Sequence, residues 1–257
     1  MRNYLMGLIL AVGAVLAVSP VILAQTTPPS GAAAKATPDL SGIWSRPGFH
    51  AELTNPDGSP LIPPMQPWAV EISRARSRAR EGGDSNTWAI DPRLACLPSG
   101  LPRSYLERST FELSQVPGRL IQIFEAARTA RIIYTDGRKQ AEGYPASFLG
   151  HSIGRWDGDT LVVDTVGFND LTWLDRGGHP HSEDLRLVER LRRVKQDTLE
   201  VDILIDDPKA YTKPWGGKVA FELRPDWELL ENFICMEHFD QDHVPVIRRL
   251  TEAFSKP

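Results

Sequence analysis

Two segments between Gly150 and Asp207 have the apolar and polar alternation of β-hairpins, and they set the fold class of the chain. Each segment joins two apolar runs across a polar turn, Asp157-Gly158-Asp159 in the first and Lys195-Gln196-Asp197 in the second. Asp-Gly between apolar runs is a strong hairpin signal, because Gly adopts the positive φ that such turns need. The loop between the hairpins carries two of the six histidines. We therefore expect a rigid antiparallel scaffold that presents a histidine-bearing loop.

Further strands are expected on both sides of the two hairpins. Short apolar runs separated by Gly, Pro and Asp turns, with little sequence typical of helix, indicate an all-β meander. Residues 40–44 begin the folded domain, and from residue 111 onward the additional predicted strands cover residues 111–116, 120–125, 131–135, 218–223 and 227–235. A meander of about nine strands is enough to close an antiparallel up-and-down β-barrel or to form two packed sheets.

The N-terminal segment predicts export. Residues 1–24 combine a positive start at Arg2, an apolar centre and a small residue, Ala24, before the expected cleavage point. A membrane anchor is the alternative, but the apolar run is short for a full span. Residues 25–38 are low in complexity and predict a disordered leader, followed by a single domain over 39–257. We expect a periplasmic or secreted protein with no membrane span after cleavage.

The net charge of −4 and the pI near 5.9 provide no basic field for nucleic acid. One basic run, Ile72–Arg80, can be interpreted as a nucleic-acid patch or as the solvated face of a short helix. Flanking glutamates and the lack of interleaved aromatic residues favour the helix. The Pro-rich region around this run excludes central strands. We interpret it as an excursion that covers one end or one face of the barrel, and as a candidate lid.

Two cysteines, Cys96 and Cys235, occur in this chain. An even number of cysteines in an oxidising compartment favours a disulfide, here between the loop before the barrel and the last predicted strand. The alternative is a reactive thiol.

The opening Leu40-Ser41-Gly42-Ile43-Trp44 resembles the Gly-x-Trp motif in the first strand of lipocalins. Together with the meander of hairpins, it makes the chain similar to the calycin group of up-and-down barrels, which includes lipocalins and fatty-acid-binding proteins. This resemblance implies a barrel with a ligand cavity and does not specify the ligand.

Most of the expected mature chain also resembles a family of exported bacterial proteins of unknown function. The segments that carry this resemblance are Leu101-Pro102-Arg103, Gly150–Trp156 and Asp207–Tyr211. Near the last predicted strand, that family has Cys-His-Glu, whereas this chain has Cys235-Met236-Glu237 and places a histidine at His238. The departure argues against a metal role at the family's histidine position.

Glu189 is an acidic residue in an apolar row. In the predicted strand Leu185–Val194, it shares the odd-numbered positions with leucines, and a strand alternates its faces with period two. We therefore expect Glu189 to face the barrel interior. Desolvation favours the neutral form of a buried carboxyl, which suits a general acid or base. The alternative is a structural ion pair with an interior arginine such as Arg131 or Arg155.

Histidines provide the other candidates for acid–base chemistry. The sequence His179-Pro180-His181 places two imidazoles close enough to approach one metal ion, and His151 or His238 can complete a set of ligands. Loop histidines beside glycines are more often solvent-exposed, and the helical His pair of many zinc enzymes is missing. We expect no cofactor and no required metal, and consider His181 and His151 for acid–base chemistry near neutral pH.

Two functions of different classes follow from these residues. One is an acid–base enzyme of the lyase, isomerase or hydrolase type acting on an apolar or aromatic small molecule, and the other is a non-catalytic carrier of lipocalin type. Most of the tryptophans are expected in the core, whereas Trp173 in the histidine-bearing loop is expected to face ligand. The catalytic candidates are Glu189, His181, His151 and Glu237, and the ligand-binding candidates are Trp173, His179, Tyr134 and Arg155.

Overall fold

The structure is a computed structural model that describes residues 37–230, apart from gaps at 47, 49–51, 56–58, 60, 82–90, 94–96, 107–109, 127–128 and 141. The predicted signal peptide, most of the predicted leader, Cys96, Cys235, Glu237 and His238 lie outside the described residues. The predictions that concern them remain predictions.

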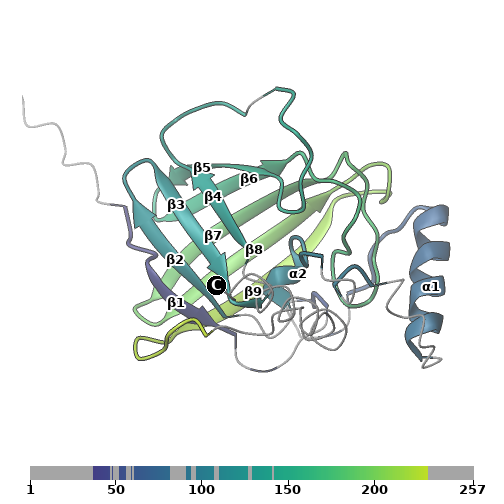
Figure 1. Cartoon of the computed structure of the whole chain (residues 1–257), viewed down its shortest axis with the longest axis horizontal. Coiled ribbons are helices and arrows are strands. Elements are labelled where there is room, and N and C mark those ends of the chain that lie inside the picture. The colour runs from purple at the N-terminus through teal and green to yellow at the C-terminus, as the bar shows by residue number, and fades with distance from the viewer. Residues whose placement is uncertain are drawn as a thin grey trace, which may run out of the picture. The chain divides into compact units, whose positions relative to one another are not determined.

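The described residues form a closed barrel with two helices (Figure 1). The elements in chain order are β1 (Gly42–Ser45), α1 (Pro67–Glu81), α2 (Arg103–Leu106), β2 (Thr110–Val116), β3 (Arg119–Phe124), β4 (Ala130–Tyr134), β5 (His151–Asp157), β6 (Thr160–Val166), β7 (Arg186–Lys195), β8 (Thr198–Asp206) and β9 (Trp215–Leu223). The predicted all-β barrel of about nine strands is therefore confirmed.

The barrel wall consists of two well-paired sheets joined by two short seams. Within β1–β4 and within β5–β9, each strand pairs antiparallel with the next. At one seam, β9 meets β1 through Trp44↔Leu223 and Ser45↔Glu222. At the other seam, β4 and β5 run parallel through Ile133↔Ser152 and Tyr134↔Ile153. The expected antiparallel meander thus holds except at β4–β5, where the long loop 135–150 returns the chain beside the strand it has just left.

Both predicted hairpins form, and their turns lie where the sequence places them. Gly158 has a φ of +63° in the β5–β6 turn, which is the conformation that favours Gly there. The last predicted strand is wrong over its described part, because residues 227–230 are not in a strand. The remainder of that strand lies outside the described residues.

Alternation along the strands builds the core. On β7, Leu187, Glu189 and Leu191 are fully buried, whereas Arg186 and Arg190, on the opposite face, are exposed. The same alternation on β8 buries Leu199, Val201 and Ile205. The barrel interior is consequently packed with apolar side chains around one polar cluster that includes Glu189.

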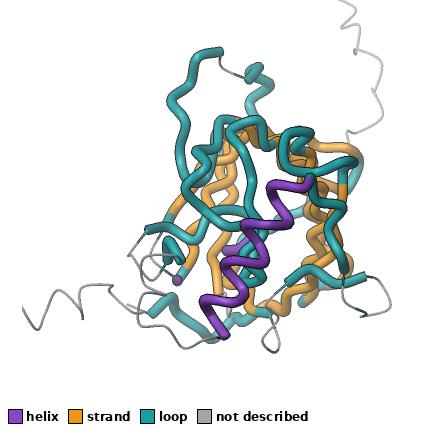
Figure 2. The backbone as a smooth tube through the Cα atoms, turned by 90° about the vertical axis from the view of Figure 1, so that its right-hand side faces the viewer, coloured by secondary structure: helices purple, strands orange, loops and turns teal. Residues whose placement is uncertain are grey.

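Helix α1 covers one end of the barrel, as Figure 2 shows in the view along that end. Its inner face follows the helical period: Ala69 and Ser73 are buried and Arg76 is half-buried, whereas Arg74 and Arg78 are exposed. Trp68 Nε1 donates to the carbonyl of Lys209, and Arg76 donates to the carbonyl of Gly178, which fixes the helix to two loops at this end. The expected excursion over one end is confirmed. No helix in the described part of the chain is both long and apolar enough to cross a membrane.

Candidate functional site

A buried ion pair crosses the barrel interior. Arg131 on β4 donates to both carboxylate oxygens of Glu189 on β7, at 2.7 and 2.8 Å. Glu189 is 0% exposed and Arg131 is 5% exposed. Of the two arginines expected to face inward, Arg131 does so. Arg155 lies on the outer face of β5 and is exposed, so its expected interior position is wrong.

Two further polar groups complete this interior cluster. Arg131 Nε donates to Gln122 Oε1 at 2.8 Å, and Arg131 Nη2 also donates to the hydroxyl of Tyr105. The Tyr105 hydroxyl donates in turn to Gln122 Oε1 at 3.1 Å. Burial raises the pKa of Tyr105, so the hydroxyl stays protonated. Arg131 therefore holds the Glu189 carboxylate and is itself held by Tyr105 and Gln122, whereas Gln122 Nε2 is buried without a partner.

An interior Glu189 is also expected to share a cavity with the histidines of the 179–181 loop or with His151 as an acid–base pair, but this combination does not form. Both Glu189 oxygens are bound by Arg131. His151 lies on the outer face of β5, where it contacts Gln140 and the ring of Tyr144, so it cannot share an interior cavity with Glu189. Tyr134 also lies on the outside of the wall, with the Arg138 guanidinium 3.8 Å from its ring centroid. Sequence alternation located Glu189 correctly but could not show which side chain reaches it from across the barrel.

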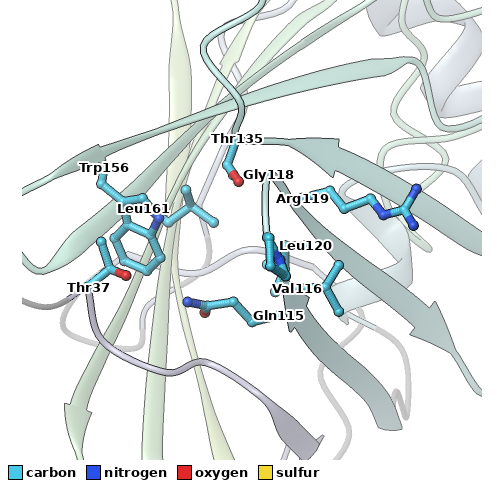
Figure 3. A pocket seen from close by; sticks show the side chains of 10 residues that line it. Thr37, Gln115, Val116, Gly118, Arg119, Leu120, Thr135, Trp156 and Leu161 are labelled. Atoms are coloured by element: carbon cyan, nitrogen blue, oxygen red, sulfur yellow. The ribbon is translucent and has the colours of Figure 1, made fainter. Parts of the chain in front are cut away.

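A pocket opens at the barrel end opposite α2, where the β2–β3 and β5–β6 turns lie (Figure 3). Its volume is about 370 Å³. Side chains from the inner face of the wall form its apolar part, and the hairpin turns and the start of the described chain form its rim. The lining residues are Thr37, Gln115, Val116, Pro117, Gly118, Arg119, Leu120, Thr135, Trp156 and Leu161. We call this site the mouth pocket.

The polar side chains of the mouth pocket are those of Thr37, Gln115, Arg119 and Thr135. Gln115 Oε1 accepts a hydrogen bond from the backbone N–H of Leu40 at 3.1 Å, which fixes the orientation of its amide. Figure 3 shows the Gln115 amide directed toward the side of the pocket where Trp156 and Thr37 lie. The indole of Trp156 presents a flat wall, and no carboxyl or imidazole group is among the lining residues.

The other end of the barrel, beneath α1, holds the histidine-bearing loop. His179 Nδ1 lies 2.6 Å from Asp175 Oδ2, and the two residues are 8% and 2% exposed. The ring of Trp215 packs edge-on against His179, with centroids 6.2 Å apart. A buried carboxylate of this kind fixes the tautomer and the orientation of its imidazole. We call this end, formed by loop 167–185, α1, α2 and loop 207–214, the covered end.

His181 has a separate environment at the covered end. Its Nε2 lies 2.8 Å from the Thr172 hydroxyl and its Nδ1 lies 3.0 Å from the Ser182 carbonyl. Burial lowers the pKa of His181, so the neutral imidazole is favoured. His179 and His181 therefore have different partners. Among the described residues, no group of three or more His, Cys, Asp or Glu side chains is placed to hold a metal ion.

Trp173 lies between two arginines at the covered end. The guanidinium carbon of Arg76 is 4.8 Å from the Trp173 ring centroid, and that of Arg103 is 5.4 Å away. Trp173 is only 4% exposed, and its indole N–H is buried with no acceptor. The residue is thus part of the packed interior of this end and does not line the mouth pocket, which differs from the ligand-facing position expected for it.

Segments that are far apart in the sequence converge at the covered end. Arg103 reaches Trp173 from α2, and Tyr211 donates its hydroxyl to the Pro180 carbonyl at 2.7 Å. Asp207 accepts hydrogen bonds from the backbone and hydroxyl of Ser182. The segments around residues 103, 173–182 and 207–211 therefore meet at this end.

Three residues of the mouth pocket and the covered end were not among the ligand-binding candidates predicted from the sequence. Trp156 and Gln115 line the mouth pocket and Arg76 lies at the covered end. The signal for Trp156 was present, because it shares the inner face of β5 with Ser152 and Gly154 and lies next to a hairpin turn, which places an inward side chain at a barrel mouth. For Arg76, the signal was its helical spacing from Ala69 and Ser73.

No protein-family model matches the chain, and no curated protein matches it in sequence.

Proposed function

We propose that the protein binds an apolar or aromatic small molecule in the mouth pocket. The observation that carries this proposal is a pocket of about 370 Å³ with an apolar base and a tryptophan wall at the open end of a closed barrel. Barrel mouths are common ligand sites, and such sites combine mostly apolar lining with a few placed polar groups. The Gly42-x-Trp44 opening and the closed barrel also support a calycin-like relationship, which we include in this proposal.

The lining indicates the chemistry of the ligand. The Trp156 indole offers a face for a flat or apolar ring, and Leu120 and Leu161 supply apolar surface beneath it. The Gln115 amide is held by the Leu40 N–H through its oxygen, so its NH₂ group is the part that remains to donate to a carbonyl or hydroxyl. Because the lining has no acid or imidazole, the pocket favours binding without acid–base chemistry.

A fluorescence titration tests the mouth pocket. The probe is N-phenyl-1-naphthylamine, an uncharged aromatic molecule whose emission rises in apolar surroundings. We expect saturable binding by the full chain, and an affinity about tenfold lower in Trp156→Ala, because ring stacking on the indole is lost. Trp227→Ala is the matched control, since Trp227 is half-exposed and does not line the pocket. Equal binding by wild type and Trp156→Ala would rule the mouth pocket out.

A second candidate function, acid–base catalysis, is favoured by the Asp175–His179 pair at the covered end. A carboxylate that orients an imidazole is the arrangement that activates a water or hydroxyl nucleophile. Hydrolysis of 4-nitrophenyl acetate tests this function. If the pair is catalytic, His179→Gln and Asp175→Asn should both lose the rate above buffer, whereas His151→Gln should retain it. A wild-type rate equal to that of buffer would exclude this function for activated esters.

We also propose that the protein is exported and that Cys96 and Cys235 form a disulfide. The N-terminal signal pattern and the even number of cysteines support this proposal. Intact mass of the unreduced protein from a periplasmic or culture fraction tests both parts. Cleavage after Ala24 and a mass lower by two hydrogens are expected. A product that begins at Met1, or that reacts with two equivalents of a thiol reagent before reduction, would contradict the proposal.

A further inference from the structure

Arg76 is a half-buried arginine without a carboxylate partner. Its Nη1 donates to the Gly178 carbonyl at 3.0 Å, and no ion pair of Arg76 occurs among the described residues. It belongs to the basic run of α1, but it differs from Arg74 and Arg78, which are exposed to solvent. A guanidinium that is partly removed from water and lacks a counter-charge is costly unless an anion completes its environment.

The position of the Arg76 guanidinium is fixed by its surroundings. Trp173 lies against it at 4.8 Å, and the Gly178 backbone lies against its aliphatic stem. A Cβ at Gly178 would come within 2.9 Å of Arg76 Cβ, so the loop can approach the helix this closely only with Gly at that position. The guanidinium is thus held in place before any ligand arrives, which reduces the entropy lost on binding.

The two guanidinium groups near Trp173 have different partners. Arg103, the second guanidinium near the ring, is neutralised by Asp91, which accepts from both Nη1 and Nη2 at 2.8 Å. Arg76 forms no such ion pair among the described residues, and Asp91 acts on it only through its charge. Burial lowers the pKa of Arg76 to about 10, which still leaves it charged at neutral pH. Among the described residues, Arg76 donates one hydrogen bond, from Nη1 to the Gly178 carbonyl. Its other two nitrogens, Nε and Nη2, are not buried without a partner.

The structure assigns a second ligand site to the covered end: Arg76, held between Trp173 and Gly178, binds the oxyanion group of a small molecule. The planar guanidinium matches a carboxylate or a phosphate, because its N–H donors form a fork that pairs with two oxygens. The Trp173 ring that contacts Arg76 carries a buried indole N–H with no acceptor, so this N–H can report on changes at the site. This site is separate from the mouth pocket and from the proposed function, since the packed core and the Arg131–Glu189 network lie between the two ends.

Calorimetric titration of the full chain tests the assignment. The probes are inorganic phosphate and acetate at constant ionic strength, with chloride as the reference salt. We expect saturable binding of at least one probe. Binding of phosphate indicates a site for phosphate groups, and binding of acetate indicates a site for carboxylates. Arg76→Gln should weaken that binding about tenfold or more, because charge-assisted hydrogen bonds are lost. Arg78→Gln removes the same charge from an exposed position of the same helix and should bind as the wild type does.

A second measurement does not depend on the folding of the variants. In ¹⁵N-labelled wild-type protein, the Trp173 indole resonance, assigned with Trp173→Phe, should shift on titration with the anion that binds. The Trp227 indole, which is half-exposed, should not shift. Absence of saturable binding of both anions, an equal loss in Arg78→Gln, or an unchanged Trp173 resonance at saturation would each overturn the assignment.

Discussion

At the scale of single residues, the Arg131–Glu189 pair raises the question of why a barrel keeps two charges in its interior. Removing a carboxylate or a guanidinium from water costs roughly several kcal/mol for each ion. The attraction between the two ions offsets this desolvation cost only when their hydrogen-bond geometry is good. Here both carboxylate oxygens are bound, and Tyr105 and Gln122 use the remaining donors of Arg131. Because Arg131 belongs to β4 and Glu189 to β7, the pair also joins the two sheets of the wall.

Glu189→Gln should destabilise the protein strongly. The change leaves the Arg131 charge buried without a counter-charge, so the free energy of unfolding should fall by about 3–5 kcal/mol. Urea unfolding measures this loss. Glu200→Gln is the matched control, because Glu200 pairs with Lys218 on the outer face of the barrel. There we expect a loss of about 1 kcal/mol or less. Comparable losses in the two variants would contradict a structural role for the interior pair.

His181 should make the folded state sensitive to mild acid. Burial lowers the pKa of His181 in the folded protein below its value in the unfolded chain, which is about 6.5. At a pH between these two pKa values, the unfolded state binds more protons than the folded state. The contribution of the neutral His181 to the free energy of unfolding is therefore complete above a pH of about 7, and it declines as the pH falls below about 6.5. The contribution of one proton is at most about 1.4 kcal/mol per pH unit.

His181→Gln tests this dependence, since Gln can still hydrogen-bond Thr172 but does not titrate. Urea unfolding at pH 7.5, 6.5 and 5.5 should show a smaller acid-induced loss in the variant than in the wild type. His151→Gln provides the comparison. Burial, and after it the charge of Arg138, also lowers the pKa of His151, but this residue is less enclosed than His181. An identical pH dependence in His181→Gln and wild type would refute the expectation.

At the scale of elements, the two seams are the weakest parts of the wall. The β7–β8 ladder has nine partner pairs, whereas β4–β5 and β1–β9 have two each. Amide exchange follows the free energy of the local opening that breaks each hydrogen bond. We therefore expect the amides of β4–β5 and β1–β9 to exchange before those in the middle of β7–β8. Exchange measured by NMR at Ile153 and Val201 gives a direct comparison, and equal protection at these two positions would contradict it.

Sequence patterns predicted some elements better than others, for physical reasons. The β5–β6 and β7–β8 hairpins were predicted because Asp157-Gly158 and Gln196-Asp197 are local turn signals between alternating strands. The parallel β4–β5 seam was missed, because strand pairing after the irregular loop 135–150 depends on contacts far away in the sequence. The strand expected from Trp227 was wrong over residues 227–230, although that segment is also apolar.

At the scale of the whole molecule, the two ends of the barrel differ in chemistry. The mouth pocket has one indole and no acid or imidazole among its lining residues, whereas the covered end contains Asp175, His179, His181 and two arginines. The histidines and Trp173 were recognised from the sequence because they lie together in one loop. The mouth pocket was not, because its lining comes from four separate segments that only barrel closure brings together.

The two-sheet wall has a consequence for how the protein can be assembled from parts. Each sheet is built from one continuous stretch of chain, β1–β4 from residues 42–134 and β5–β9 from residues 151–223. A break between Gly143 and Tyr144, in the exposed part of the joining loop, would leave every long ladder inside one fragment. The short seams and the Arg131–Glu189 pair would then act as the recognition surface between two separate polypeptides. Coexpressed halves should copurify as a reconstituted barrel, and Glu189→Gln in one half should weaken that association, which makes this fold a candidate for fragment complementation.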